Sequence, residues 1–238
     1  MSRILTHCLL MLVVASAGLA DSDPVAAQQR PGAAGRGRFP TKPGEIITPP
    51  DRGERWANRL EIGGPAPEFT LPLLTKNDGT VKTVSLRDLH GKRPVVLIFG
   101  SMTCPPFRSQ LDGVDEVYEQ FKDRAEFLFV YIREAHPDSV LSVVDADGGE
   151  SLFKIPQAAD ASTRTSSAAF CQRTVKLSMP IAVDGIDNAV GKAYAGWPNR
   201  MVVVGTDGKV AYASDPAPGG TNAERLNAWL QANVAGGK

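Results

Sequence analysis

A wholly apolar run followed by a cysteine and two prolines constrains the fold of this chain more than any other feature. The run Val95–Phe99 has the pattern of a buried strand. Cys104 follows after a short turn, and Pro105 and Pro106 come directly behind it. Proline is tolerated in the first turn of a helix because the backbone N–H groups there have no partner to lose. Since apolar residues then recur at three- and four-residue steps, the sequence predicts a strand, a cysteine at a helix N-terminus and the helix itself.

The expected position of Cys104 favours a reactive thiol. The unpaired N–H groups and the dipole of a helix N-terminus stabilise the thiolate, which is the nucleophilic form of cysteine. We therefore expect the pKa of this thiol to lie below the free-cysteine value of about 8.5. The alternative is a buried cysteine that serves as a small apolar residue. Phe107 is the third residue after Cys104, so there is no Cys-x-x-Cys pair here, and oxidised Cys104 needs a thiol from elsewhere.

The N-terminus has the features of a secretory signal peptide. Arg3 supplies positive charge, residues 9–15 form a short apolar core, and small residues follow. The apolar core is too short to span a bilayer, which needs about 20 residues. We therefore expect residues 1–20 to be a signal peptide and the mature chain to be secreted or periplasmic. Residues 21–54 are rich in small and polar residues without an apolar period and are predicted to be a disordered linker.

Residues 55–238 have the length of one domain with a full core. The 26 Lys and Arg residues balance 26 Asp and Glu residues, and the basic residues are dispersed, which argues against nucleic acid as a partner. Without the signal peptide two cysteines remain, Cys104 and Cys171, too few for a scaffold built on disulfides. Cys171 falls on a predicted helix and is either a structural core residue or the thiol that resolves oxidised Cys104. The oligomeric state is left open.

The rest of the pattern predicts alternating strands and helices of the α/β class. We expect strands at residues 69–73, 81–84, 95–99, 126–132, 180–184, 201–204 and 210–212, and helices at residues 85–89, 105–121, 163–177, 188–194 and 221–234. The segment from residue 137 to about residue 163 shows no regular pattern. A parallel β-α-β unit, a hairpin and a closing helix are typical of a thioredoxin-like fold of the redoxin and peroxiredoxin branch, with a central mixed sheet flanked by helices. In such folds a cis proline before the hairpin faces the active cysteine, and Pro198 has that position.

Three segments resemble the iodothyronine deiodinase family: Gly100–Phe107, Val130–Pro137 and Asp184–Arg200. The resemblance covers residues 64–215, and in animal members of the family the position of Cys104 holds selenocysteine. It implies a redox-active nucleophile at Cys104 and a histidine, His136, beside the active site. The chain departs from the family because sulfur replaces selenium and residues 138–179 contain no second active-site histidine. The animal enzymes are also membrane-anchored, whereas a signal peptide is expected here, so the substrate stays open.

Polar residues in these segments are the candidate site residues. His136 is expected to hydrogen-bond a substrate or give a proton to a leaving group, or else to cap a strand end. Glu134 either orients a neighbour or acts itself. The hydroxyl groups of Ser101 and Thr103 are candidate donors to the sulfur, unless they only close the turn. Arg200 is a candidate support for a thiolate or an anionic substrate, unless it lies at the surface. No metal is expected, and no cofactor beyond an external thiol or a reductant protein.

These features lead to the hypothesis of an exported thiol-dependent oxidoreductase that acts on a small-molecule or disulfide substrate. The Cys104 thiolate attacks a peroxide oxygen, a disulfide sulfur or an aryl iodide, and a reductant protein or small thiol restores it. One alternative is a peroxiredoxin-type peroxidase, for which Ser101 supplies the usual hydroxyl but Leu97 stands in place of the usual proline. The other alternative is a non-catalytic module that binds a protein partner.

Overall fold

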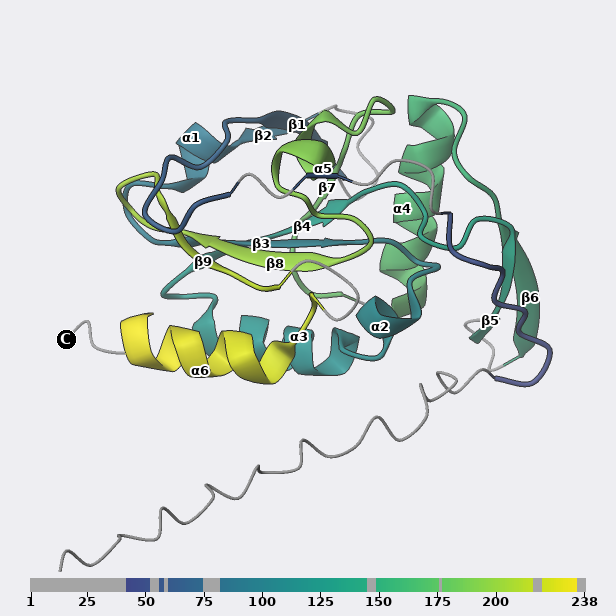
Figure 1. Cartoon of the computed structure of the whole chain (residues 1–238). Helices are drawn as coiled ribbons and strands as arrows, with labels where there is room; N and C mark the ends of the chain where they lie inside the picture. The colour runs from purple at the N-terminus through teal and green to yellow at the C-terminus, as the bar shows by residue number, and fades with distance from the viewer. Residues whose placement is uncertain are drawn as a thin grey trace, which may run out of the picture. The chain divides into compact units, whose positions relative to one another are not determined.

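A seven-stranded mixed sheet forms the centre of the fold (Figure 1). Its strands are β1 (Thr70–Leu73), β2 (Lys82–Ser85), β3 (Val95–Gly100), β4 (Glu126–Tyr131), β7 (Ile181–Val183), β8 (Arg200–Val204) and β9 (Val210–Ala213). The order across the sheet is β2-β1-β7-β4-β3-β8-β9. The central strands β3, β4 and β7 are parallel, and the outer strands on both sides are antiparallel to their neighbours. The predicted central mixed sheet is therefore confirmed.

The structure, a computed structural model, describes residues 42–51, 56–57, 60–74, 82–144, 149–175, 177–215 and 220–234. The predicted signal peptide, residues 1–20, and residues 21–41 of the predicted linker lie outside the described residues. No helix in the described part of the chain is long and apolar enough to cross a membrane.

Helices cover both faces of the sheet. One face packs against α3 (Leu111–Phe121), α4 (Ala161–Val175) and α6 (Ala223–Val234), and the other against α1 (Leu86–Leu89) and α5 (Ala189–Ala193). Because successive residues of a strand point to opposite faces, β3 sends alternate side chains into the two buried clusters: Val96 and Ile98 into the first, and Val95, Leu97 and Phe99 into the second. Burial on both faces explains why this strand has no polar side chain.

The helix predicted after Cys104 is split in two. A single turn of helix, α2 (Pro105–Arg108), is followed by a short turn and then by α3. Phe107 of α2 stacks on Phe129 of β4, with ring centroids 4.9 Å apart, and packs over Gly100. A Cβ atom at Gly100 would lie 2.5 Å from the Phe107 ring, so glycine is required for α2 to approach the end of β3 so closely. This close packing seats Cys104 against the sheet.

Residues 42–51 belong to the folded domain, which corrects the prediction of a disordered linker that extends to residue 54. Ile46 forms an antiparallel bridge with Val140 of β5 (Ser139–Val144) through two backbone hydrogen bonds of 2.8 Å. The segment is short and rich in proline, and its partners lie far along the chain, so no local pattern predicts the contact. We refer to residues 42–51 as the N-terminal strap.

An ion pair joins the strap to helix α2. The Glu45 carboxylate lies 2.9 Å from the Arg108 guanidinium and accepts a hydrogen bond from the N–H of Ser142 (3.1 Å). Burial of the side chain, which is 1% exposed, acts to raise the pKa of Glu45. Hydrogen bonds from backbone N–H groups and from Arg108 outweigh this effect, so the pKa lies below its ordinary value and the pair is charged at neutral pH.

A separate two-stranded sheet lies within the segment that showed no regular pattern. Here β5 pairs with β6 (Glu150–Ile155) in an antiparallel hairpin. Apolar and serine residues do not alternate cleanly in either strand, and β5 obtains its second neighbour only from the strap. The hairpin therefore depends on contacts that are distant in sequence, which explains why the local pattern failed to predict it.

Replacing Glu45 by Ala is expected to destabilise the fold. The change leaves Arg108 and the N–H of Ser142 without this acceptor. An unsatisfied buried polar group costs about 1–3 kcal/mol, so urea denaturation should show a free energy of unfolding lower by about 2 kcal/mol. Glu61→Ala, at an exposed position, is the control and should change the value by less than about 0.5 kcal/mol. Unchanged stability of Glu45→Ala would contradict the packing of the strap.

Candidate active site

Cys104 lies in the turn between β3 and α2, where the sequence places it, and its side chain is 1% exposed. The side-chain amide of Asn199 donates a hydrogen bond to its sulfur, with the nitrogen 3.3 Å from Sγ. Cys104 makes no side-chain capping hydrogen bond at the start of α2. Hydrogen bonds from N–H groups are strongest when the acceptor is charged, so the Asn199 contact favours negative charge on the sulfur.

Burial nevertheless holds the thiol in its neutral form. It raises the pKa of Cys104 to about 11, against the lowering effect of the Phe107 and Asn199 donors, and the charge of Glu134 raises the pKa further. A charged sulfur loses its hydration here, and α2 is a single helical turn with few aligned peptide dipoles. The prediction of a pKa below the ordinary value is therefore wrong for this closed structure. The sequence indicated the helix N-terminus but not the depth at which the sulfur lies.

Asn199 is the site residue that sequence reasoning missed. It directly follows Pro198, whose peptide bond with Trp197 is cis, as predicted. The oxygen of its side chain accepts a hydrogen bond from the N–H of Thr221 (2.6 Å), and its nitrogen reaches the sulfur. The expected geometry drew attention to the proline, whereas the side chain in contact with Cys104 belongs to the next residue. Because asparagine is common in turns for purely local reasons, its type gave no functional indication.

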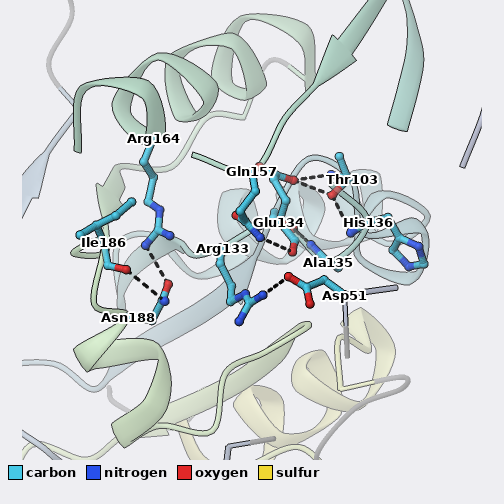
Figure 2. A network of polar contacts seen from close by, with 11 residues as sticks. Asp51, Thr103, Arg133, Glu134, Ala135, His136, Gln157, Arg164, Ile186 and Asn188 are labelled. Atoms are coloured by element: carbon cyan, nitrogen blue, oxygen red, sulfur yellow. Dashed lines mark hydrogen bonds and ion pairs between the residues drawn. The ribbon is translucent and has the colours of Figure 1, made fainter. Parts of the chain in front are cut away.

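A buried carboxylate organises the turn that carries Cys104. Glu134, 2% exposed, accepts hydrogen bonds at one oxygen from the backbone N–H (3.0 Å) and the hydroxyl (2.6 Å) of Thr103, as Figure 2 shows. Its other oxygen accepts from the Tyr131 hydroxyl at the end of β4. Gln157 binds the backbone of the same residue, with its Oε1 3.0 Å from the Glu134 nitrogen. Glu134 therefore connects the cysteine turn to the carboxyl end of β4.

This network corrects the role predicted for Thr103. A hydroxyl group has one proton to donate. That of Thr103 goes to Glu134, so this hydroxyl is not the donor to the sulfur and instead holds the carboxylate in place. The Ser101 hydroxyl accepts from the N–H of Ala135 (3.1 Å), and its role as a donor to the sulfur stays a prediction.

Burial raises the pKa of Glu134, and the hydrogen bonds from Thr103 and Tyr131 lower it without cancelling that effect. Burial and the charge of Glu134 also raise the pKa of Tyr131 well above its ordinary value. The Tyr131 hydroxyl therefore stays protonated and donates a hydrogen bond to the carboxylate. The result is a buried acid whose protonation changes the charge close to Cys104.

His136 lies at the other end of this network. Its backbone N–H donates to the Thr103 hydroxyl (3.1 Å), and its ring Nδ1 lies 2.7 Å from the carbonyl oxygen of Thr48 in the strap. A carbonyl only accepts, so Nδ1 carries a proton and Nε2 is the acceptor of the neutral ring. Figure 2 shows the imidazole directed away from Glu134, and the residue is half-buried. Because Nδ1 is bound to Thr48, the proton transfer predicted for His136 would use Nε2.

The strap contacts the site at a further point. Asp51 forms an ion pair with Arg133 (Figure 2), and its N–H donates to the carbonyl of Ala135 (2.9 Å). The Arg133 guanidinium lies 5.9 Å from the ring centroid of Trp197, the residue before the cis proline. With Glu45 at α2, and Thr48 and Asp51 at residues 133–136, the strap binds the two segments that follow β3 and β4 beside Cys104.

Arg200 has a role different from the predicted support of a thiolate or an anionic substrate. Its side chain is buried, and its guanidinium donates to the carbonyl oxygens of Ser214 (3.1 Å) and Tyr194 (2.9 Å). Successive residues of an extended chain point in opposite directions, so the contact of Asn199 with the sulfur turns Arg200 away from it. Arg200 therefore binds backbone groups of the loops beside β8.

Cys171 lies on α4 and is fully buried in the same apolar cluster as Cys104. Both cysteines are free thiols in this structure. Burial raises the pKa of Cys171 strongly, which disfavours a thiolate there. These features fit a core residue, and the resolving role stays a prediction. Among the described residues, no group of three or more His, Cys, Asp or Glu side chains has the arrangement of a metal site.

Fold and site together define a thioredoxin-like protein with a cysteine in the turn between β3 and α2. The similarity to solved structures agrees with this fold. An uncharacterized conserved protein from Geobacillus kaustophilus superposes with a TM-score of 0.53 at 17% identity, covering 75% of this chain and 85% of that chain. A thiol:disulfide interchange protein from Bacteroides sp. gives a TM-score of 0.52 at 18% identity, covering 75% of this chain and 93% of that chain.

The family model for iodothyronine deiodinase matches residues 52–234. Thyroxine 5-deiodinase of Gallus gallus is 34% identical over 169 residues, which is 71% of this chain and 62% of the relative. The enzyme of the same name from Homo sapiens is 31% identical over 171 residues, 71% of this chain and 52% of the relative. The chain belongs to the iodothyronine deiodinase family. It matches little more than half the length of these relatives.

The rate of alkylation of Cys104 is expected to be low at neutral pH and to increase as the pH approaches 11. A thiol with a pKa of about 11 carries on the order of a hundredfold less thiolate at pH 7 than free cysteine. Iodoacetamide kinetics, resolved for the Cys104 peptide by mass spectrometry, measure this directly. The chain unfolded in guanidinium is the control and should react like free cysteine. A midpoint at or below the free-cysteine value would show that the sulfur is not held as described.

Replacing Glu134 by Gln is expected to destabilise the protein and to flatten its pH dependence. The new NH₂ group cannot accept from Thr103 or Tyr131, at a cost of about 1–3 kcal/mol. Folding raises the pKa of Glu134, so protonation of this residue stabilises the folded wild type fully at pH values below the ordinary carboxyl pKa. This stabilisation is lost as pH rises through the raised pKa. Urea denaturation from pH 4 upward compares the two proteins. Glu116→Gln, at an exposed position, should behave as wild type.

Proposed function

We propose that this protein is a thiol-dependent oxidoreductase of the deiodinase type in which Cys104 is the redox nucleophile. The observation that supports this most directly is the hydrogen bond that the buried amide of Asn199 donates to the buried sulfur of Cys104. An apolar core position needs no such donor, because a neutral thiol packs without one. Donors aimed at a sulfur are useful where the sulfur becomes negative during a reaction.

The two-electron chemistry follows from the thiolate. With an aryl iodide as substrate, the Cys104 sulfur takes the iodine, and the ring carbon keeps the electron pair of the broken bond and binds a proton. The sulfenyl iodide is then attacked by an external thiol, which releases iodide and leaves a mixed disulfide. A second thiol takes the outer sulfur and releases Cys104 as a thiolate, with the reductant oxidised to its disulfide. The imidazolium form of His136 can supply the proton for carbon from Nε2.

Access to the sulfur is part of this proposal. Cys104 is 1% exposed, so a substrate reaches it only when the surrounding segments open. Opening also admits water to the sulfur, which weakens the burial effect that raises its pKa. Approach of the substrate and formation of the thiolate are therefore coupled in one conformational step.

The location of the reaction rests on the N-terminal sequence. Arg3 and the apolar core of residues 9–15 support export to a secreted or periplasmic location. The reductant there is an external thiol or a partner protein, because Phe107 stands where a Cys-x-x-Cys pair would place the second cysteine. No further cofactor is part of the proposal.

The substrate is the least constrained element. The relatives named thyroxine 5-deiodinase favour an iodinated aromatic compound. A peroxidase of the peroxiredoxin type is the competing enzyme, but Leu97 stands where such an enzyme usually has a proline. A binding module without catalysis would keep its function without a thiol at position 104, which separates it from both enzymes.

The proposal is tested by challenging the protein separately with hydrogen peroxide, a small disulfide and an iodinated phenol in the presence of dithiothreitol. We expect at least one compound to be consumed and to leave a sulfenic, mixed-disulfide or sulfenyl-iodide adduct on the Cys104 peptide. Cys104→Ser should lose turnover at least a hundredfold. Cys171→Ser is the control and should keep it, because an external thiol performs the reduction. Turnover by Cys104→Ser at the wild-type rate would exclude Cys104 as the nucleophile.

A further inference from the structure

The orientation of the Asn199 side chain is determined by its surroundings. Asn199 is fully buried, and the backbone N–H of Thr221 lies 2.6 Å from one end of its amide. A backbone N–H can only donate, so this end of the amide is the oxygen. The other end, which lies 3.3 Å from the Cys104 sulfur, is therefore the NH₂ group. The contact is a donor to the sulfur and not an acceptor of the thiol proton.

The backbone on both sides holds this amide in position. A Cβ atom at Gly220 would lie 2.3 Å from the carbonyl oxygen of Asn199 and 3.2 Å from the Cα of Arg200. The segment before α6 therefore lies directly on the segment after the cis proline. Thr221, the next residue, donates the hydrogen bond that orients the amide. A donor held in advance needs no rearrangement when charge appears on its acceptor.

The groups around Cys104 have opposite effects on the pKa of its thiol. Burial and the carboxylate of Glu134 raise the pKa of the thiol, whereas the N–H of Phe107 and the amide of Asn199 lower it. The Phe107 contact comes from the backbone and is the same for any residue other than proline at that position. The Asn199 contact depends on the side chain, so the sequence at position 199 adjusts how readily the sulfur becomes negative.

We propose that Asn199 is a catalytic residue whose amide N–H donates to Cys104 Sγ and stabilises the thiolate, both as the attacking nucleophile and as the group released when the mixed disulfide is reduced. This inference rests on the proposed function insofar as Cys104 is the nucleophile. The hydrogen bond itself and its effect on the sulfur are measurable without a substrate. In both steps the same donor faces the same negative atom, so its loss slows attack and release together.

Two substitutions separate the hydrogen bond from the charge. Asn199→Asp keeps the oxygen that accepts from Thr221 but replaces the donor by a second acceptor, which is negative when ionised. Asn199→Leu removes the donor without adding charge. The hydrogen bond to a charged sulfur predicts a rise of about one unit in the alkylation midpoint of Cys104 for the Leu variant, a roughly tenfold slower reaction at pH 9. The Asp variant should react more slowly still. Asn233→Asp, at an exposed position of α6, is the matched control and should equal wild type.

The outcomes of this experiment distinguish the two proposals. If both variants alkylate at the wild-type rate, the inference about Asn199 is wrong, whatever Cys104 does in turnover. If only the Asp variant is slower, its charge and not the lost hydrogen bond is responsible, and the inference fails again. If the alkylation shifts are found but wild-type protein consumes none of the three test compounds, the hydrogen bond stands and the catalytic assignment of Asn199 falls with the proposed function. Thermal unfolding and circular dichroism identify which variants fold. Asn199→Leu, or Asn199→Ala if the Leu variant does not fold, tests the donor because neither adds charge.

Discussion

The buried carboxylate of Glu134 is the interaction on which the site depends. It binds both the backbone and the hydroxyl of Thr103, one residue before the cysteine, and it accepts from Tyr131 at the end of a central strand. A carboxylate taken out of water is stable only where such donors replace its hydration. The turn that carries Cys104 therefore has one favourable arrangement, and Phe107 locks it from the other side by packing over Gly100.

The same compactness sets the chemistry of the sulfur. Burial keeps Cys104 protonated, while the amide of Asn199 donates to the sulfur and stabilises its charged form. In the closed protein the thiol is consequently protected from chance oxidation, because susceptibility follows thiolate character and exposure. The reactivity of this thiol then depends on opening of the surrounding segments rather than on a permanently low pKa.

The sequence predicted those parts of the structure that local patterns encode. The apolar run of β3, the prolines after Cys104 and Pro198 before the hairpin were sufficient to predict the fold and the place of Cys104 between β3 and α2. Features that depend on distant partners were not predictable. The strap and the Asn199 contact each join residues that are far apart along the chain, and the β5–β6 hairpin, itself local, pairs with the strap through Val140.

The errors have the same origin. Thr103 was correctly placed beside the cysteine, but the carboxylate that uses its proton lies more than thirty residues further along the chain. The pKa of Cys104 was misjudged because a helix start can be recognised from prolines, whereas the depth of a sulfur is a property of the whole packed domain. Arg200 was recognised as important, but only the direction of its neighbour Asn199 shows what it binds.

The strap also has a consequence for the order in which the protein folds. Its contacts with Arg108, Arg133 and Ser139 span 63, 82 and 91 residues, and closing long loops costs chain entropy that local contacts do not. The strap leaves the ribosome early, but all of these partners are synthesised later, and the last of them lies in β5. We therefore expect the strap to dock after the sheet has formed. The strap is thus synthesised before the segments around Cys104 but packs against them after they have folded.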